Sequence, residues 1–486
     1  MLTFFDSLAK KNIPFYPQKK GSATMYNCGP TVYDYVHIGN LRSFLFADFL
    51  RRYLEFRGIE VLQVMNITDV GHMLADADVG EDKMEVAATK AGKTPQEVAQ
   101  FFTDAFFKDI DRLNIRRAHM YPKASDHVSE MIALIERLLA NGCAYKVKEE
   151  TGEKDFGVGG KNASVYFDVA AFPSYGKLSG NILENLNAGA RVDVRTEKKN
   201  PADFALWIYN PNHLMQWEAP WGKGYPGWHI ECSAMAMKYL GETIDIHTGG
   251  EDNKFPHHEC EIAQSEGATG KPFVGTWLHV THLLVNGEKM SKSKGNFYTL
   301  DDLVARGYSP REVRYLLLSA HYRQTFNFTL QGIAGARAAL DRLDTVADAV
   351  RQATSQIAGK SAPVAKAAMK AFSAALDDDL NIAEALGAVF AFVRATNERM
   401  ASGEFTMAER EAADHFFQDI GAVLGFTFGH AAEDVEIPQS ILALVEKREE
   451  ARAEKRFAEA DRIRDELKEK GYLVEDTPEG RRVKRI

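Results

Sequence analysis

The chain has 486 residues, of which 45% are hydrophobic and 26% are charged, and its formal net charge is −9. A chain of this length is expected to hold roughly two to four domains and can bury a large core. The negative net charge excludes a general positive field for nucleic acid, so any RNA contact must come from local basic patches.

The four cysteines are widely scattered, at Cys28, Cys143, Cys232 and Cys260. Such spacing in a long chain argues against a disulfide framework and leaves metal binding open. The segment 1–12 mixes charged and apolar residues, so we expect no secretory signal. No apolar run approaches the length that spans a bilayer. We therefore expect a cytoplasmic protein without membrane contact.

The stretch 28–43 reads CGPTVYDYVHIGNLRS and joins a short predicted strand, Thr24–Asn27, to a long predicted helix. Gly58 is placed to end that helix, and Val61–Asn66 predicts a second strand. Strand, helix and strand of this length open a parallel α/β sheet, in which ligands bind at the carboxyl ends of the strands. One face of the helix carries apolar residues at helical spacing, namely Phe46, Phe49, Leu50, Tyr53 and Leu54.

Two separate stretches predict a phosphate-binding site. His37 and Asn40 lie at the start of the helix, where free N–H groups and the helix dipole favour anions. They are three positions apart, so their side chains share a face and can reach one anion. Far downstream, the loop KMSKSKGN places Lys289 and Lys292 beside small hydroxyl residues, which suits a triphosphate.

Polar residues continue this edge of the sheet, because Asn66–Asp69 follows the second strand. Further on, the apolar pattern predicts a helix over Asp126–Ala140, with Ser125 or Asp126 as its cap. A stretch broken by Gly, Asn and Pro comes next. We interpret it as part of an insertion, at about 120–225, between the halves of a nucleotide-binding fold.

A second group of ligand-binding residues is predicted beyond this insertion. A helix is expected to begin at Pro226, and a strand over Thr243–Thr248 ends at Gly249 and Gly250. Two glycines at a strand end allow a ligand to approach the backbone, and Asp252 is placed to bind a ribose hydroxyl. The alternative for this segment is a simple turn.

The last third of the chain is predicted to be mostly helical. Thr354–Val364 has the composition of a linker, and Ala365–Gly425 is typical of a helical bundle. The tail is predicted to form one charged helix over Ser440–Lys470, a turn at Gly471 and a short extended end. Four of the last six residues are basic, which makes this end a local basic patch.

Cys28 and Cys232 are candidate metal ligands. An isolated cysteine is most often a small buried hydrophobe, but Cys28 leaves the first strand, where ligands are expected. Thiolate, imidazole and carboxylate are all permitted zinc ligands. An open coordination position would make such a site catalytic or substrate-binding.

A predicted helix supplies the remaining candidates. His257 and Glu261 are four positions apart, so from one helix face they can bind one ion. Cys260 is a softer ligand than Glu261, and the residues alone leave the fourth ligand open between these two. His258 points about 100° away from His257 around the helix, so we expect it to form a hydrogen bond.

Several of these stretches together resemble the motif set of the cysteinyl-tRNA synthetases, a class I aminoacyl-tRNA synthetase family, and the resemblance covers nearly the whole chain. The stretches are HIGN, NITD, GWHIECSAM, GGEDNKFPHHECEIAQ and KMSKSKGN. The resemblance implies a Rossmann-like parallel-sheet catalytic domain at 1–330, with the insertion at about 120–225. It implies an all-α helical bundle at 331–435 and a small anticodon-binding domain at 436–486.

The resemblance also implies roles for individual residues. The implied zinc ligands are Cys28, Cys232, His257 and Glu261. The implied cysteine pocket includes Thr68 and Trp228. The implied catalytic and ATP-binding positions are His37, Gly39, Asn40, Gly249, Asp252, Lys289 and Lys292. The implied tRNA contacts are Arg452, Phe457, Asp461 and Asp476, with Phe457 as a candidate stacking platform whose alternative role is core packing.

The sequence departs from the family pattern at two places. Asn40 stands where the commonest form has a second histidine, so this position keeps an N–H donor but cannot be cationic. Val70, Gly71 and His72 follow NITD where acidic residues are more usual.

The implied reaction is ATP-dependent activation of L-cysteine to cysteinyl-adenylate, followed by transfer to the 3′ end of cysteine tRNA. Zn²⁺ would select the substrate thiolate, and Mg²⁺ would accompany ATP; a monomer is expected. One alternative is a related cysteine ligase with an amino-sugar acceptor, which is shorter at the C-terminus. Another is a non-catalytic RNA- or nucleotide-binding paralogue, which the intact HIGN and KMSKS stretches disfavour.

Overall fold

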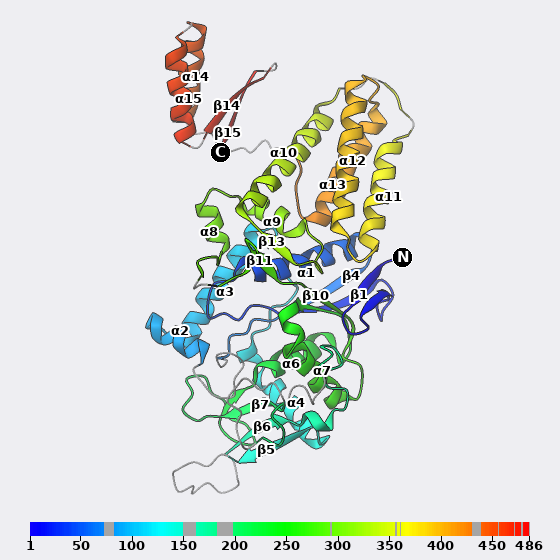
Figure 1. Ribbon diagram of the computed structural model, residues 1–486, viewed down its shortest axis with the longest axis vertical. Helices are drawn as coiled ribbons and strands as arrows, with labels where there is room; N and C mark the ends of the chain where they lie inside the picture. Colours follow the sequence, from blue (N-terminus) through cyan, green and yellow to red (C-terminus); the bar gives the residue numbers. More distant parts are fainter. Residues whose placement is uncertain are drawn as a thin grey trace. The chain divides into compact units, whose positions relative to one another are not determined.

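The chain folds into two compact units, Met1–Phe428 and Gly429–Ile486. The computed structural model, drawn in Figure 1, describes residues 1–71, 82–148, 162–181, 198–291, 294–354, 357–359, 361–429, 439–454, 456–470, 472–477 and 480–485. Every helix in these ranges is too short or too polar to cross a membrane.

A four-stranded parallel sheet forms the centre of the first unit, in the order β10-β9-β3-β4. Its strands are β3 (Ser22–Asn27), β4 (Glu60–Met65), β9 (Ile244–Gly250) and β10 (Val274–Val280). Chain order reverses between β3 and β9, which makes this pair the switch point where such sheets bind ligands. The Rossmann-like sheet that the sequence predicts is therefore confirmed.

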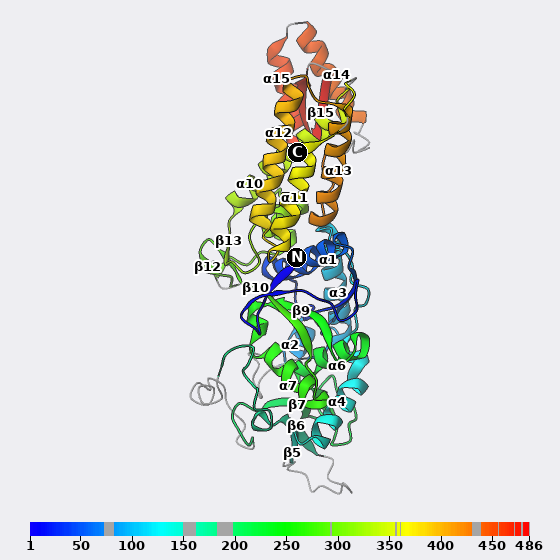
Figure 2. The same ribbon diagram turned by 90° about the vertical axis from the view of Figure 1, so that its right-hand side faces the viewer.

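Helices cover both faces of this sheet, because neighbouring side chains of each strand point to opposite sides. Met25 of β3 packs in the cluster that contains α1 (Ile38–Phe56), whereas Tyr26 packs in the cluster that contains α6 and α7. In Figure 2, α6 (Trp228–Leu240) and α7 (His257–Thr269) lie on the side of the sheet away from the bundle helices. Helix α1 ends at Phe56 with Arg57 as its C-cap, and Gly58 follows at φ 77°, the left-handed conformation of a glycine that ends a helix, as predicted.

The segment between β4 and α6 carries helices and a second sheet, which is antiparallel. Its helices are α2 (Lys83–Ala91), α3 (Pro95–Arg112), η2 (Ala124–His127), α4 (Val128–Ala140) and η3 (Val169–Ala171). Its strands are β5 (Ala144–Lys148), β6 (Ala163–Phe167), β7 (Phe204–Tyr209) and β8 (Gly224–Pro226).

The cap predicted for the helix that ends at Ala140 is wrong. The helix α4 begins two or three residues later than Ser125 and Asp126, after the 3₁₀ turn η2, and has no side-chain cap. Asp69 provides the physical reason: it accepts hydrogen bonds from the Ser125 N–H at 2.8 Å and from its hydroxyl at 2.6 Å. The hydroxyl is therefore bound to the edge of the sheet and not to the helix.

Several short elements complete the part of the first unit outside the bundle. They are β1 (Thr3–Asp6), β2 (Lys11–Pro14), η4 (Glu251–Lys254), β11 (Leu283–Val285), β12 (Glu288–Lys289), α8 (Leu300–Ala305), α9 (Pro310–Leu318) and β13 (Phe326–Phe328). The bundle helices are α10 (Leu330–Gln352), α11 (Pro363–Asp377), α12 (Ile382–Ala401) and α13 (Met407–Leu424). Pro363 and Val364 form the first turn of α11, so the predicted linker ends two residues too late; proline suits this position because its missing N–H is not needed there.

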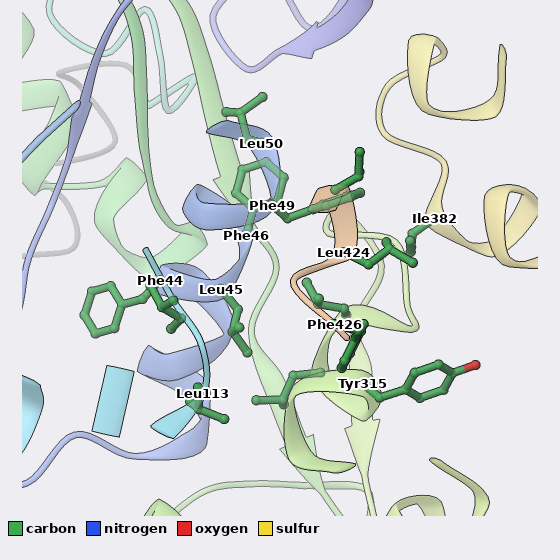
Figure 3. Packing of buried hydrophobic residues seen from close by; sticks show 14 of the residues in the cluster. Phe44, Leu45, Phe46, Phe49, Leu50, Leu113, Tyr315, Ile382, Leu424 and Phe426 are labelled. Atoms are coloured by element: carbon green, nitrogen blue, oxygen red, sulfur yellow. The ribbon is translucent and has the colours of Figure 1, made fainter. Parts of the chain in front are cut away.

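Helix α1 connects the sheet to the bundle. Figure 3 shows its labelled side chains from Phe44 to Leu50 with Leu424 and Phe426, at the end of α13, close by. One continuous cluster of buried side chains therefore extends from β3 through α1 to the bundle helices.

The second unit consists of α14 (Gln439–Ala453), α15 (Phe457–Glu469) and a hairpin of β14 (Tyr472–Thr477) and β15 (Gly480–Arg485). The single charged helix predicted here is wrong, since the chain divides it into α14 and α15. The two helices pack together, and this fold-back buries Ile441 and Val445 of α14 with Ile463 and Leu467 of α15. A straight helix would leave both sets exposed to water.

A buried ionic cluster joins α1 to the bundle and is formed by Asp48, Arg52 and Arg314. Asp48 accepts from Arg52 Nε at 2.8 and 2.9 Å and from Arg314 Nη2 at 2.6 Å. The two guanidinium groups also donate to carbonyl oxygens, Arg52 to Asn114 and Arg314 to Leu424. The cluster is nearly inaccessible to water, so each charge depends on the others.

We predict that Asp48→Ala destabilises the protein strongly, because it leaves two buried guanidinium groups without their carboxylate. The expected loss in the free energy of unfolding, measured by urea denaturation, is about 3–5 kcal/mol. Asp111→Ala is the matched control, because Asp111 pairs with Arg117 at 2.7 Å on the surface. That variant should change stability little. Similar small losses in both variants would contradict the assigned role of the cluster.

Candidate active site at the carboxyl edge of the sheet

A cleft of about 480 Å³ opens at the carboxyl ends of β3 and β9, at the switch point of the sheet. The structure brings most of the predicted site residues to its walls: Cys28, His37, Gly39, Asn40, Thr68, Trp228, Cys232, Asp252, His257 and Lys289. Glu261 lies buried below it, beside Cys28 and His257. Lys292 lies outside the described residues, as does His72.

His37 and Asn40 form a reciprocal cap at the start of α1. The Nδ1 atom of His37 accepts from the N–H of Gly39 at 3.0 Å and of Asn40 at 3.2 Å, and the Asn40 amide oxygen accepts from the His37 N–H at 3.1 Å. In a neutral imidazole the proton is then on Nε2. The amide oxygen of Asn40 is used by the cap, so its NH₂ group is the part that can donate to a phosphate. Asparagine at this position therefore supplies both the acceptor of the cap and a donor for the cleft.

The lysine-rich loop docks against this helix start. The N–H of Ile38 donates to the Tyr298 carbonyl at 3.0 Å, and a Cβ on Gly39 would lie 3.0 Å from the Met290 methyl group. Asn296 fixes the loop through its amide, which accepts from the Ser291 N–H at 2.8 Å and donates to the Lys289 carbonyl at 3.2 Å. The two predicted phosphate-binding stretches are thus adjacent in space.

A group of possible metal ligands lies at the inner end of the cleft. One ligand atom from each of Cys28, Cys232, His257 and Glu261 lies within 4.8 Å of the others. Glu261 Oε1 is 3.2 Å from His257 Nε2 and 3.7 Å from Cys28 Sγ. A second group shares two of these residues and replaces the others by His247 and His258. Its geometry is equally compact, so proximity alone does not choose between the two groups.

The histidines of the second group also make hydrogen bonds. His258 Nδ1 is 2.8 Å from His279 Nε2, and His279 Nδ1 is 2.8 Å from the Ser7 hydroxyl, so His258 belongs to a buried hydrogen-bonded chain, and its Nε2 is 3.2 Å from Cys28 Sγ. His247 Nε2 is 2.9 Å from Glu261 Oε2 and orients that carboxylate. The hydrogen bond predicted for His258 is therefore confirmed.

Cys260, the alternative fourth ligand, is placed elsewhere. Its Sγ atom is 3.5 Å from the Tyr175 hydroxyl, in the apolar cluster behind α7. Of the two candidates left open by the sequence, only Glu261 joins the thiols of Cys28 and Cys232.

Burial controls the charge of the two thiols. Loss of contact with water raises the pKa of Cys28 well above its usual value, and the neighbouring Cys232 adds to the effect. A hydrogen bond from Cys28 lowers the pKa of Cys232, but burial and the charge of Glu261 outweigh it, so this pKa is raised as well. Burial also lowers the pKa of His258 well below its usual value. Thiolates at this point therefore require a cation beside them.

A residue that the sequence analysis missed, Glu231, supports the cleft. Glu231 is fully buried and accepts from the Thr68 hydroxyl at 3.0 Å, and Asn66 donates to the same hydroxyl oxygen at 2.9 Å. The ring of His257 lies 4.8 Å from that of Trp228. Glu231 immediately precedes Cys232, but a charged residue next to a candidate ligand is too common a signal to identify it.

Glycines permit close packing at two points. A Cβ on Gly29 would lie 1.7 Å from the Asn66 carbonyl oxygen, and one on Gly249 would lie 2.6 Å from the His258 ring. Gly249 therefore makes room for His258, whereas its neighbour Gly250 lines the cleft.

The four residues predicted to contact tRNA all lie in the second unit. Arg452 is in α14, Phe457 and Asp461 are in α15, and Asp476 is in β14. Phe457 is 61% exposed, which eliminates the alternative of core packing.

Comparison with known proteins gives matches along almost the entire chain. The model of the class I (C) tRNA synthetase catalytic domain matches residues 14–338, a DALR domain matches 371–429, and the cysteinyl-tRNA ligase anticodon-binding domain matches 434–483. A cysteine–tRNA ligase of Caldicellulosiruptor saccharolyticus is 45% identical over 100% of both chains. The chain belongs to the cysteinyl-tRNA synthetase family. A second cysteine–tRNA ligase, from Thermus thermophilus, is 44% identical over 99% of this chain and 98% of its own.

Solved structures agree on the fold of this family member. Mycobacterium tuberculosis methionyl-tRNA synthetase, in complex with methionyl-adenylate, aligns with a TM-score of 0.59 and 16% identity, over 83% of this chain and 89% of its own. This alignment supports the fold alone, whereas the match to a class I catalytic domain and the cysteine–tRNA ligase relatives make the protein an enzyme of this class.

We predict that Gly29→Ala disrupts the cleft, because its methyl group would overlap the Asn66 carbonyl oxygen. The expected loss in the free energy of unfolding is about 1–3 kcal/mol or more, measured by urea denaturation. Gly387→Ala in α12 is the matched control, since its Cβ meets nothing within 4 Å. That helical substitution should raise stability by up to about 1 kcal/mol. Equal effects in the two variants would refute the packing argument.

Proposed function

We propose that this enzyme activates L-cysteine with ATP to give cysteinyl-adenylate and pyrophosphate, and then transfers the cysteine to the 3′ end of cysteine tRNA. One observation carries the proposal: a thiol-rich group of metal ligands and a phosphate-binding helix start line the same cleft. Few reactions other than activation of a thiol-bearing substrate by a nucleotide need both. The family membership supports the same reaction.

The ATP end of the cleft is assigned to the HIGN and KMSKS stretches. The His37 imidazole and the Asn40 amide would donate to the phosphates from the positive end of α1. Lys289, which lines the cleft, and Lys292, which is assigned from the sequence, would neutralise charge that develops as pyrophosphate leaves. Mg²⁺ would accompany ATP, and Asp252 would bind a ribose hydroxyl. The absence of a side chain on Gly39 lets Met290 of the lysine-rich loop pack against the start of the helix.

The other end of the cleft fits zinc. Two thiols, an imidazole and a carboxylate are a suitable donor set, and Cys232, His257 and Glu261 are buried. Burial raises the pKa of both thiols, and a divalent cation is the group that would stabilise them as thiolates. Zinc held by Cys28, Cys232, His257 and Glu261 would supply an open position for the thiolate of the substrate.

Selection of cysteine over serine then follows from chemistry. The two amino acids differ by one atom, and shape discriminates poorly between such neighbours. A cysteine thiol has a pKa near about 8.5 and loses its proton readily beside a metal ion, whereas a serine hydroxyl does not. Thr68, which donates to Glu231, and Trp228, whose ring lies 4.8 Å from that of His257, would position the rest of the amino acid.

The acceptor is assigned to tRNA on account of the second unit. A cysteine ligase with an amino-sugar acceptor has no use for an anticodon-binding domain, and residues 434–483 match one. The exposed Phe457 and the basic end of the chain are suited to an RNA loop.

We predict cysteine-dependent exchange of pyrophosphate into ATP, followed by charging of cysteine tRNA. The first reaction needs only the cleft, and the second also needs the acceptor. Exchange without charging would favour the amino-sugar alternative. Absence of exchange by the folded, zinc-supplemented protein would refute the proposed activity.

We predict that the purified protein holds one zinc ion per chain and that Cys232→Ser reduces zinc content and cysteine affinity together. Mass spectrometry of the metal and the KM for cysteine in the exchange reaction measure these effects. Cys143→Ser is the matched control, since its thiol lies 3.7 Å from the Gly267 carbonyl, outside the donor group.

X-ray absorption should show one more sulfur neighbour of zinc when cysteine is added, but not when serine is added. An unchanged number of sulfur neighbours would contradict selection of cysteine by zinc.

A further inference from the structure

Three aromatic side chains form an exposed cluster at the rim of the cleft. Tyr35 lies in the loop before α1, and Phe101 and Phe102 lie on α3. The ring centroids of Tyr35 and Phe102 are 5.1 Å apart, those of Phe101 and Phe102 are 5.2 Å apart, and those of Tyr35 and Phe101 are 6.1 Å apart. We name these three residues the aromatic lip.

The rings of the aromatic lip contact one another and are accessible to water. Tyr35 is 43% and Phe101 47% exposed, and all three pairs meet edge to face. Edge-to-face contact fixes each ring without covering all of its faces. Below the lip, the buried rings of Phe44 and Phe106 lie 5.3 Å apart and hold α3 against α1. The exposed rings are therefore presented on a fixed support.

One lysine lies directly against the lip. The exposed Lys93 places its ammonium group 5.2 Å from the centroid of Phe101. The neighbouring carboxylates bond to neutral donors: Asp34 accepts from the Tyr35 N–H, Glu97 from Thr94 and Asp104 from Gln100. The Lys93 ammonium group lies beside the rings, where it can meet a phosphate.

The lip is continuous with the proposed reaction site. Tyr35 lines the cleft two residues before His37. Further in, the ammonium group of Lys83 lies 5.6 Å from the centroid of Tyr33 and 5.9 Å from that of Trp228. Aromatic rings and lysines therefore extend from the cysteine end of the cleft to the outer surface of α3.

We propose that the aromatic lip is the stacking surface for the single-stranded 3′ end of the tRNA and holds the bases that precede the terminal adenosine while that adenosine enters the cleft. The inference rests on the proposed function, because it names the place where the acceptor of that reaction is held. Stacking on exposed rings beside lysines is how single-stranded nucleic acid is bound without reading of its sequence. A cluster made for a protein partner would not need the cation over the ring or the continuity with the cleft.

The test compares two transcripts of cysteine tRNA, one intact and one without its last three nucleotides. For the intact transcript, Phe101→Ala should raise the Kd by roughly 5- to 150-fold, the range expected for one stacked base. For the shortened transcript, which has no bases to stack, the Kd should not change. Phe101→Tyr keeps the ring and should bind normally, whereas Phe101→Leu keeps only apolar bulk and should resemble Phe101→Ala.

Val86→Ala on α2 is the control, because Val86 is equally exposed, at 42%, but offers no ring. The proposal would be overturned if Phe101→Ala or Phe101→Leu bound the intact transcript normally, or if the loss were equal with both transcripts. Normal binding by these variants would point to a protein partner for the lip. Pyrophosphate exchange uses no tRNA and should be unchanged in all Phe101 variants. Its absence from the wild-type protein would refute the proposed function, whereas the binding comparison would still decide the role of the lip.

Discussion

The rest of this structure depends on one constraint: imidazole, thiol and carboxylate groups are buried between the parallel sheet and the helices α6 and α7. Each buried imidazole, thiol or carboxylate at the switch point loses its contact with water and needs a partner within the protein. His257 meets His229 at 2.9 Å, Glu261 meets His247, and His258 meets His279. The elements β9, β10, α6 and α7 are thereby tied together by the same groups that would hold an ion.

Helix α1 connects this buried site to the rest of the first unit. Its start carries the phosphate-binding cap of His37 and Asn40, its middle carries Asp48, and its end lies beside the bundle. Tyr53 and Arg57 near its C-terminus both bond to Asp377 of α11. A displacement of the bundle would therefore move the same rigid helix that presents its N–H groups to the cleft.

The central fold could be predicted because its signals are local. The apolar spacing from Phe46 to Leu54 defines one helix, and the residues around Cys28 mark the end of a strand. The metal-ligand group could be predicted only in part: helical spacing paired His257 with Glu261 but left Cys260 open, since the direction of a side chain depends on how α7 packs. Only the structure shows Cys260 facing Tyr175.

Other features depend on contacts between distant segments, which no local pattern records. Serine is a common helix-capping residue, but the N–H and hydroxyl of Ser125 donate to Asp69 instead. The charged tail has a helical composition throughout, and its division into α14 and α15 follows from burial of Ile441 against Ile463. Glu231 supports Thr68 across the sheet edge, although nothing in its immediate neighbourhood distinguishes it from a surface glutamate.

The separation of the metal-ligand residues has a consequence for the order of events during synthesis. Cys28 and Glu261 are 233 positions apart, so the first thiol emerges from the ribosome long before its partners. Until β9 and α7 have been made and docked beside β3, this cysteine has no enclosed site and remains an ordinary accessible thiol. Capture of an ion at this point would therefore report that the parallel sheet is complete.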